Sequence, residues 1–418
     1  MSDKTPNLRH LRAFHEVARL HSISAAAECV YLSQSALTQA IAKLEQALHC
    51  GLFHRRHNGL YLTEEGKLFH HRVGRCLDLL GQGVRETIRS GERKDATRHP
   101  AADPAAAVTN THLRALLALQ HAPTFSSAAR AIGVSQPAVY RAVHDLEDQL
   151  NVKLVEKTSI GISLTKGALR LVRLARLALK EIGQGFDELS DFSGMDSTSI
   201  VVGSMPLART YILPSAINRL SELRPAARIS VVEGPYDDLL QRLLSGEVDL
   251  LIGALRDPLP TNDVVQHLLF DTELSVVCRN DHPLVGRRGL TLADLAAYRW
   301  VVPRTSTPAR TWFDQLITRE VPEVRQGLVE CSSQVVIREL LTGSDRLTFI
   351  SSHQIQHEQQ QGILAVLDTE LPATRRPIGL TQRGDWHPTP TQRLFLSIIK
   401  SLSEQLSCGR SAPGLADT

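Results

Sequence analysis

The stretch from Ser24 to Leu48, SAAAECVYLSQSALTQAIAKLEQAL, predicts two short helices joined by a tight turn. Ser24 is a candidate N-cap for the first helix, whose small side chains allow close packing. Ser33 is a candidate N-cap for the second helix, in which apolar residues recur every three or four positions. The second helix is therefore expected to bury one face and to present a polar one.

The polar face carries side chains whose length and hydrogen-bonding groups suit base edges and phosphates in a major groove. These side chains are Ser33, Gln34, Ser35, Thr38, Gln39 and Lys43. A pair of amphipathic helices is common in helical proteins, so the pair alone supports DNA binding and ordinary helix packing equally. The residues that follow the pair favour DNA binding.

These residues predict a two-stranded hairpin, because Asn58-Gly59 is a strong hairpin signal. Basic and imidazole side chains occupy the hairpin at Arg55, Arg56 and His57. A hairpin beside a helix-turn-helix is a wing. A long helix is expected next, capped by Thr63 and reaching towards Ser90.

This order of motifs resembles the N-terminal module of the LysR-type transcriptional regulators, from about Leu8 to about Ser90. The resemblance rests on Ser-Gln at the start of the second helix, Leu-Phe before the basic wing, and Leu-Thr-Glu-x-Gly before the long helix. It implies that Gln34, Ser35, Thr38 and Gln39 face bases, and that Arg55 and Arg56 lie near phosphate or the minor groove. The family usually has a basic residue at the wing tip. Asn58 stands there instead, so we expect a weaker minor-groove contact or one made by His57.

The composition is that of a globular chain with several domains: 418 residues, 42% hydrophobic and 22% charged, with a mean hydropathy of −0.11. A net charge of +3 does not by itself indicate nucleic acid, so any basic surface must be local. The N-terminus lacks the apolar core of a signal peptide, and no apolar run approaches the ~18 residues of a membrane helix. We therefore expect a cytoplasmic protein with no membrane partner. Six cysteines without metal-ligand spacing predict reduced thiols, with no metal or other cofactor.

The helix pair and the wing recur 102 positions later in the chain. His10-Leu11-Arg12-Ala13 reappears as His112-Leu113-Arg114-Ala115, Ser33-Gln34 as Ser135-Gln136, and Leu62-Thr63 as Leu164-Thr165. So many matches at one offset predict a tandem duplication. The expected winged helix-turn-helix modules span residues 1–90 and 109–192, each with a long linker helix, and residues 91–108 have the composition of a flexible linker.

The second module has its own candidate DNA-contacting residues, namely Ser135, Gln136, Pro137, Tyr140, Arg141 and Lys157. Its wing also carries an acid, Glu156, and an apolar residue, Ile160, where phosphate contact favours cations. This copy could therefore be a second DNA reader, or a dimerisation or spacer module. In LysR-type regulators the linker helix pairs with its mate in a dimer. The helix from Lys166 to about Leu189 could pair within the chain, as a pseudo-dimer, or each copy could pair with its counterpart in a second chain.

Residues 198–406 alternate β-branched runs with amphipathic helices, which predicts an α/β domain, and residues 407–418 are expected to be a disordered tail. The run from Leu274 to Leu284 resembles the middle of the LysR-type effector domain, a two-lobed fold of the periplasmic-binding type (type 2). Val232 to Pro235 and Gly379 to Arg383 are most similar to the branch with galactose-binding-protein and protocatechuate-responsive regulators. On that fold one lobe would take about 198–265 and the returning C-terminus, and the other about 266–366.

Candidate effector-binding residues lie where strands end and helices begin, because free N–H groups and the positive end of the helix dipole point into the cleft there. The candidates are Ser204, Met205, Gly234, Arg304, Thr305, Ser306, Thr307, Ser332 and Ser333. Their hydroxyl groups suit a carboxylate or a sugar, yet serine or threonine before a helix is equally often a plain N-cap. Arg304 and Arg310 are candidate partners of an anionic effector.

Catalysis is not expected, because the sequence contains no nucleophile elbow, no phosphate-binding glycine loop and no metal spacing. The sequence predicts a LysR-type regulator that binds promoter or operator DNA as a homo-oligomer, either a dimer or a tetramer. Its small-molecule effector, a sugar or an aromatic or organic acid, would bind between the two C-terminal lobes. The alternative is an architectural DNA-binding regulator that senses no ligand and whose second module only dimerises.

Overall fold

The protein is described here from a computed structural model, which covers residues 6–57, 59–95, 97, 103–194, 198–305, 307–372 and 374–408. Asn58, Ser306, part of the predicted linker and the tail from residue 409 lie outside the described residues. The chain divides into two compact units, Met1–Thr198 and Ser199–Thr418. Of the helices in the described part, none is both long enough and apolar enough to cross a membrane.

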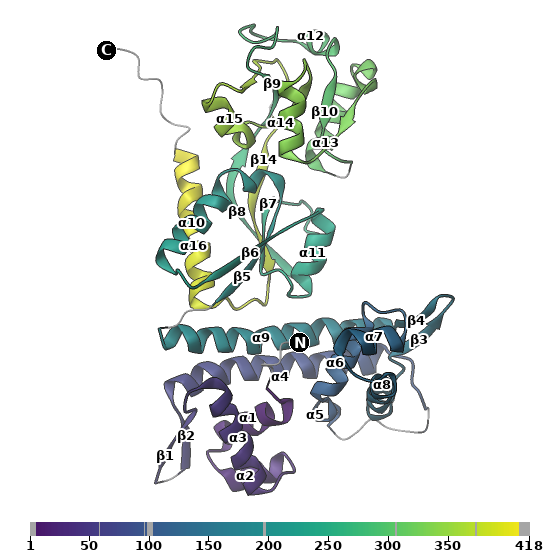
Figure 1. The fold of residues 1–418 in the computed structure, drawn as a ribbon, viewed down its shortest axis with the longest axis vertical. Helices are drawn as coiled ribbons and strands as arrows, with labels where there is room; N and C mark the ends of the chain where they lie inside the picture. Colours follow the sequence, from purple (N-terminus) through teal and green to yellow (C-terminus); the bar gives the residue numbers. More distant parts are fainter. Residues whose placement is uncertain are drawn as a thin grey trace. The chain divides into compact units, whose positions relative to one another are not determined.

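The first unit begins with a helix-turn-helix, a wing and a long helix (Figure 1). Its elements are α1 (Leu8–Leu20), α2 (Ile23–Cys29), α3 (Gln34–Leu48), β1 (Phe53–Arg56), β2 (Gly59–Leu62) and α4 (Glu64–Ser90). Ser33 caps α3 as predicted, since its Oγ accepts a hydrogen bond from the Ala36 amide at 3.2 Å. The predicted cap of α2 is wrong. Ser22 has the extended backbone of an N-cap, whereas Ser24 is already helical.

The same order of elements occurs a second time in this unit. It follows one short helix, α5 (Pro104–Ala107), and comprises α6 (Asn110–Leu119), α7 (Phe125–Ile132), α8 (Gln136–Leu150), β3 (Val155–Thr158), β4 (Gly161–Leu164) and α9 (Lys166–Phe192). Gly59 and Gly161, which are 102 positions apart, begin the second wing strands with φ of 143° and 144°. A Cβ there would approach the main-chain oxygen of His21 to 2.5 Å or that of Pro123 to 2.2 Å. Both wings therefore require glycine at the same place.

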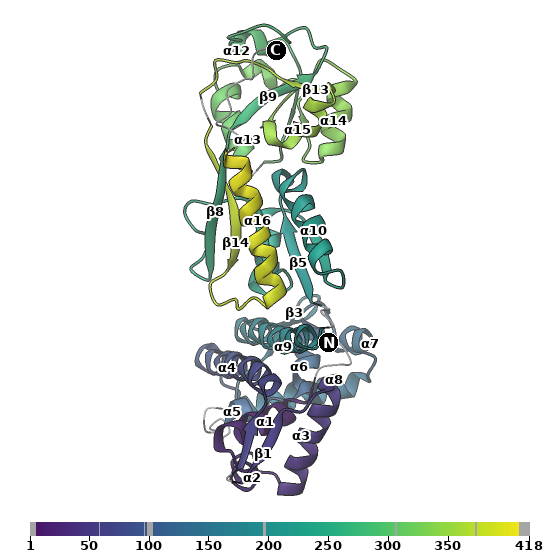
Figure 2. The ribbon, with the colours of Figure 1, turned by 90° about the vertical axis from the view of Figure 1, so that its left-hand side faces the viewer.

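The two long helices, α4 and α9, pack against each other in antiparallel directions, and both views show them side by side (Figures 1 and 2). Arg72 near the start of α4 hydrogen-bonds Glu188 near the end of α9 at 3.0 Å. Thr87 near the end of α4 donates its hydroxyl to the Gly167 carbonyl oxygen at 2.9 Å. Of the two pairings that the sequence left open, the described chain contains the internal one.

Part of the predicted flexible linker makes specific contacts with the second module. The Asp95 amide donates to Asn151 Oδ1 at 2.9 Å, Asn151 Nδ2 donates to the Asp95 carbonyl oxygen at 2.7 Å, and Lys153 pairs with Glu92 at 2.7 Å. Residues 104–107 form α5, which Asp103 caps. The expectation of an unstructured linker is therefore wrong for these residues. Composition gave no sign of the contacts, because the partners belong to the second module.

The second unit contains two five-stranded sheets, in the orders β6-β5-β7-β14-β8 and β11-β10-β12-β9-β13. The elements of the first sheet are β5 (Ser199–Ser204), η1 (Pro206–Arg209), α10 (Ile212–Leu223), β6 (Arg228–Glu233), α11 (Tyr236–Leu244), β7 (Leu250–Ala254), β8 (Val264–Thr272), β14 (Arg376–Arg383) and α16 (Pro390–Cys408). Those of the second are β9 (Leu274–Arg279), α12 (Leu292–Ala296), β10 (Trp300–Val302), α13 (Pro308–Phe313), η2 (Asp314–Thr318), η3 (Pro322–Arg325), β11 (Val329–Glu330), α14 (Gln334–Thr342), β12 (Leu347–Ser351), η4 (Ser352–Ile355), α15 (Gln356–Gln360) and β13 (Leu364–Val366). Each sheet has a separate buried core.

Two expectations for this unit need correction. Residues 264–272 form β8, which pairs with β14 of the first sheet, so the boundary between the two sheets lies after Thr272 and not at Val265. β8 was not predicted from the sequence, because an edge strand exposes many of its side chains and so lacks the pattern of a buried strand. The amphipathic stretch from Leu207 to Leu223 suggests one helix by its sequence, but it is interrupted between Arg209 and Ile212. Pro214 explains the break, since proline has no amide hydrogen to continue a helical ladder.

Candidate nucleic-acid and effector sites

The polar face of α3 is open to solvent. All six of the predicted side chains are exposed, namely Ser33, Gln34, Ser35, Thr38, Gln39 and Lys43, while Leu37, Ile41 and Leu44 are buried on the other face. Thr38 Oγ1 donates to the Gln34 carbonyl oxygen at 2.8 Å, so the helix backbone holds this hydroxyl. The long side chains of Gln34, Gln39 and Lys43 are those whose reach suits base edges and phosphates.

The first wing combines cations with aromatic rings. Arg55, Arg56 and His57 are exposed, as the prediction requires. The Arg56 guanidinium lies 5.2 Å from the centroid of the Tyr61 ring, and the His21 ring stacks on the same tyrosine at 4.6 Å. Stacking holds the arginine in place without neutralising it, which suits a phosphate contact.

A hollow beside the first wing includes residues that sequence reasoning missed. It is lined by His21, His54, Arg56, Tyr61, Leu62, Thr63, Glu64 and Lys67. His21, Tyr61 and Lys67 belong to three different segments and meet only in the folded module. The available signal was the aromatic residue within a basic hairpin. Lys67 is paired with Glu64 at 2.6 Å, so part of its charge is already offset.

The second module exposes an equivalent helix face. The exposed residues at the start of α8 are Ser135, Gln136, Pro137, Tyr140 and Arg141. The Tyr140 ring centroid lies 4.0 Å from that of His144 and 5.3 Å from that of Phe125, which fixes an aromatic cluster on this face. Arg141 Nε donates to the Pro137 carbonyl oxygen at 3.2 Å. The face therefore differs in chemistry from that of α3, although its backbone is the same.

The second wing is less basic than the first. Lys157 is its exposed cation, and Glu156 accepts a hydrogen bond from the Ser163 hydroxyl at 3.1 Å. Ile160 is 84% exposed at the tip, where the first module has Asn58. This wing offers an apolar tip and one cation, so any contact with phosphates must be weaker than in the first module.

In the second unit, the ends of the strands from the two sheets face each other. Thr210, just after η1, donates its hydroxyl to the His353 carbonyl oxygen in η4 at 3.3 Å. β10, β11 and β12 are parallel, so their carboxyl ends share the edge at which η4 begins. β5, β6 and β7 are likewise parallel and share the edge at which η1 begins. Gly234 follows β6, and Thr305 and Ser332 follow β10 and β11, so these predicted effector residues lie at the strand ends where α/β folds bind ligands.

Some predicted effector residues are placed for other roles. Ser204 is fully buried, and Met205 is only 9% exposed and packs over Gly253. Thr307 accepts a hydrogen bond from the Arg310 amide at 3.3 Å, which makes it a plain N-cap of α13. Arg310 pairs with Asp314 and Glu330 at 3.0 and 2.9 Å. These contacts weaken the case for direct ligand binding by these residues.

The other candidates remain accessible at the facing edges. Arg304, Thr305 and Ser333 are exposed, and Gly234 and Ser332 are half-buried. Ser333 occupies the N-cap position of α14 without a side-chain capping hydrogen bond, so its hydroxyl is not used there. Ser306 lies outside the described residues.

Two arginines that sequence reasoning missed lie in the first sheet's lobe. The Arg256 guanidinium lies 4.3 Å from the Tyr236 ring centroid, and Arg256 Nη1 and Arg376 Nε are buried without a hydrogen-bond partner. Burial, and then the positive charge of Arg256, lower the pKa of Arg376 to about 10. Burial also lowers the pKa of Arg256, partly offset by Tyr236 and the exposed Asp237. Isolated arginines in loops and strand ends carry no sequence motif that could have identified them.

None of the five cysteines whose side chains the structure describes forms a disulfide. Cys29, Cys50, Cys76, Cys278 and Cys331 are free thiols. Burial raises the pKa of Cys76 and Cys278 to about 12, which keeps both protonated at neutral pH. Among the described residues, no group of histidine, cysteine or acidic side chains could hold a metal ion.

Comparison with known proteins identifies both units. The model "Bacterial regulatory helix-turn-helix protein, lysR family" matches residues 8–67 and again 111–168, and the model "LysR substrate binding domain" matches residues 193–403. The regulator GalR of Pseudomonas putida is 34% identical over 397 residues, which cover 95% of this chain and 97% of that protein. PcaQ of Agrobacterium fabrum is 28% identical over 302 residues, 72% of this chain and 96% of that protein. The solved CbnR–DNA complex matches with a TM-score of 0.49 at 18% identity, over 69% of this chain and 98% of that one.

Winged helix-turn-helix modules with an exposed polar recognition helix, joined to an α/β effector-binding domain, define a ligand-responsive DNA-binding regulator. The chain belongs to the LysR family of bacterial transcriptional regulators. Its relatives are regulators and not enzymes, which confirms the expectation from the sequence.

Proposed function

We propose that both winged helix-turn-helix modules read operator DNA and that an acidic small molecule, bound between the two sheets of the C-terminal unit, controls this binding. The observation that carries the DNA part is the pair of equivalent exposed faces on α3 and α8, each opening with Ser-Gln at the helix start. A face of this kind on the second helix of a helix-turn-helix lies in the major groove. Such a regulator acts in the cytoplasm, where its DNA is.

The two modules are a tandem duplication in this proposal. The family model matches each of them, and the matching residues keep one offset of 102 positions. The alignment with GalR covers 95% of this chain and so runs through both modules, whereas the 302 residues aligned with PcaQ leave room for one. A two-module arrangement shared with GalR favours a working second reader over a spacer.

The effector is an acid rather than a neutral sugar in this proposal. Arg256 and Arg376 are partly buried cations with unused N–H groups, and an anion would satisfy both their charge and their hydrogen bonds. Hydroxyls from the second sheet, at Thr305, Ser332 and Ser333, would orient it. Ligand binding at facing edges would change the angle of the two lobes, as in other hinged domains.

The DNA part is tested by footprinting on the region upstream of the protein's own gene. Gln34→Ala should reduce protection of one half of the site, and Gln136→Ala with Arg141→Ala should reduce protection of the other. Thr342→Ala, on α14 of the second unit, is the control. Full protection by the double variant would show that the second module is a spacer or dimerisation module.

The effector part is tested by thermal unfolding with panels of carboxylic acids and of neutral sugars. An acid that raises the midpoint should lose its effect in Arg256→Ala and keep it in Arg219→Ala, an exposed arginine on α10. A midpoint shift by sugars alone would contradict an acidic effector. No shift by any ligand would favour the architectural alternative, in which no ligand is sensed.

A further inference from the structure

The packing of α4 on α9 repeats itself across the interface. Gly83 of α4 lies against Leu171 and Leu174 of α9, where a Cβ would meet their side chains at 3.1 and 3.2 Å. The counterparts of these three residues, 102 positions away, are in contact as well: Gly185 of α9 lies against Phe69 and Arg72 of α4, with a Cβ at 3.0 and 3.3 Å. Each glycine thus lets the other helix approach closely. Such reciprocal contact is the geometry of a two-fold symmetric dimer.

A second contact confirms that equivalent positions meet. The Leu8 amide, at the start of α1, donates to Asn110 Oδ1, at the start of α6, at 2.8 Å. Leu8 and Asn110 are themselves 102 positions apart. A residue that touches its own equivalent must lie close to a two-fold axis. The first unit is therefore a pseudo-symmetric dimer built from one chain.

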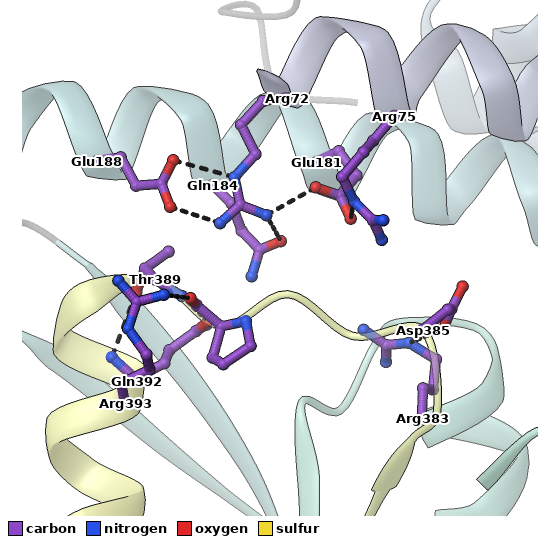
Figure 3. A network of polar contacts seen from close by, with 11 residues as sticks. Arg72, Arg75, Glu181, Gln184, Glu188, Arg383, Asp385, Thr389, Gln392 and Arg393 are labelled. Atoms are coloured by element: carbon purple, nitrogen blue, oxygen red, sulfur yellow. Dashed lines mark hydrogen bonds and ion pairs between the residues drawn. The ribbon is translucent and has the colours of Figure 1, made fainter. Parts of the chain in front are cut away.

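The two halves of the helix interface differ in charge. In one half, Arg72 and Arg75 of α4 hold Glu181 of α9, with N–O distances of 2.7 and 3.0 Å (Figure 3). Arg72 also pairs with Glu188 at 2.5 Å and hydrogen-bonds Gln184. Its side chain is only 2% exposed, so these charges are withdrawn from water.

The other half of the interface is apolar at the same three positions. Leu174 and Leu177 of α9 replace the two arginines, and Leu79 of α4 replaces Glu181. All three leucines are buried, with exposures of 3%, 6% and 9%. The flanking residues do not differ, since Gln82 and Glu86 stand where the charged half has Gln184 and Glu188. One half is thus an Arg-Arg-Glu cluster and the other a leucine cluster.

This asymmetry discriminates between pairings. If α4 paired with α4 of a second chain in the same register, Leu79 would replace Glu181 beside Arg72 and Arg75, and Arg72 would keep only Glu86, which stands where Glu188 does. If α9 paired with α9, Glu181 would face Leu174 twice. A buried charge without its partner is strongly unfavourable. Pairing α4 with α9 gives Arg72, Arg75 and Glu181 all of their partners. The short connection from α4 to the second module also raises the effective concentration for pairing within one chain.

We propose that the Arg72–Glu181 cluster pairs the two modules within one chain, so that one chain is a complete reader of two half-sites that differ in sequence and occur in a fixed order. The proposal rests on the proposed DNA-binding function of both modules. The half-sites must differ because α3 presents Gln34, Ser35, Thr38 and Gln39 where α8 presents Gln136, Pro137, Tyr140 and Arg141. A homodimer of single modules would instead read an inverted repeat.

Cysteine cross-linking of the full-length chain tests the pairing. Gly83→Cys with Leu174→Cys places two Cβ atoms within reach of a disulfide across α4 and α9. Oxidation should give a single chain of unchanged mass that migrates faster on a non-reducing denaturing gel. A covalent dimer, or no cross-link of either kind, would overturn the proposal. Each single cysteine variant and the wild type, with its six native cysteines, are the controls under the same oxidant.

Selection of binding sites from random DNA tests the consequence. The wild-type chain should enrich two unlike half-sites in one order and spacing. Gln34→Ala should reduce the sequence preference at one half-site by about tenfold. Gln136→Ala with Arg141→Ala should reduce the preference at the other half-site by about tenfold. An inverted repeat of one half-site would overturn this inference but leave DNA binding intact. Absence of any sequence preference would instead overturn the proposed function.

Discussion

The two winged helix-turn-helix modules share a backbone but not a surface. Where the first wing has His54, Arg55, Arg56 and His57, the second has Glu156, Lys157, Thr158 and Ser159 at the same positions. The glycine that begins the second strand of each wing has the same φ within one degree. Packing and backbone constraints thus give both modules the same fold, while their exposed positions, which cost little to change, differ.

The modules also differ at a pair of positions between the first helix and the long helix, which is half-buried in the first module. In the first module, the rings of His15 and His70 stack between α1 and α4 with centroids 4.8 Å apart. The equivalent residues of the second module are Leu117 and Val172. A titratable pair in one module and an apolar pair in the other should give the modules different responses to pH.

The largest expected effect comes from the charged half of the α4–α9 interface. Arg72→Leu copies the residue of the apolar half but leaves Glu181 buried without its main partner, which should destabilise the first unit by about 3–5 kcal/mol. Urea unfolding followed by far-ultraviolet circular dichroism measures this. Fluorescence of Trp300, Trp312 and Trp386, all in the second unit, should report an unchanged transition there.

The matched control is Arg19→Leu, which removes an exposed arginine from its pair with Glu16. Surface pairs contribute ~0.5 kcal/mol, so this variant should unfold almost as the wild type does. Equal losses in the two variants would contradict a special role for the buried cluster. Restoration of stability by Arg72→Leu combined with Glu181→Leu would confirm that the unpaired carboxylate is the cause.

A smaller effect is expected when the two wings are compared on DNA. Arg55→Ala should reduce the slope of log affinity against log salt by about 0.9, the contribution of one phosphate contact. Lys157→Ala, the same change at the equivalent position of the second wing, should reduce it by less, because Glu156 and the apolar tip at Ile160 disfavour close approach to phosphate. Fluorescence anisotropy on random-sequence DNA at several salt concentrations measures both. A larger slope change for Lys157→Ala would reverse the assignment of the stronger wing.

The smallest effect is the pH response of the first module. Burial, and then the charges of His15 and His71, lower the pKa of His70 below its ordinary value of 6.5. The unfolded chain therefore takes up this proton more readily than the folded one. The corresponding stability is fully present above pH 6.5 and is lost as pH falls through 6.5 towards the lower folded pKa.

His70→Val, which copies Val172 of the second module, should make the unfolding midpoint of the first unit less sensitive to pH between 7 and 5. The measurement is thermal unfolding by circular dichroism at a series of pH values. His57→Val, which removes an exposed histidine of the first wing, is the control. A pH dependence that persists unchanged in His70→Val would assign it to other groups, such as His10, whose pKa burial also lowers.

Much of the fold could be predicted from periodicity and from turn and cap residues. Ser33 and Thr63 cap the helices that they were expected to cap. The misses have local causes. Strand β8 is an edge strand with many exposed side chains, and α2 begins two residues earlier than the sequence suggests, with Ser22 in place of Ser24 as its N-cap.

The residues of the candidate sites could likewise be predicted only in part from the sequence. The exposed residues of α3 and α8 could be predicted, because one helix face is polar by sequence alone. Met205 and Ser204 could not be excluded from the effector site until their burial was known. Arg256 and Tyr236 could not be included, since a stacked arginine in a loop has no recurring pattern along the chain.

The sequence by itself determined that this chain carries two LysR-type DNA-binding modules and an effector domain, because helix periodicity, turn residues and the repeat at 102 positions are properties of order along the chain. Only the tertiary structure decided how the modules pair. Arg72 and Glu181 are 109 positions apart, and each by itself is an ordinary charged residue on a helix. Their burial against each other, opposite a leucine cluster at the equivalent positions, becomes visible only when α4 lies on α9, since desolvation depends on what surrounds a charge in space.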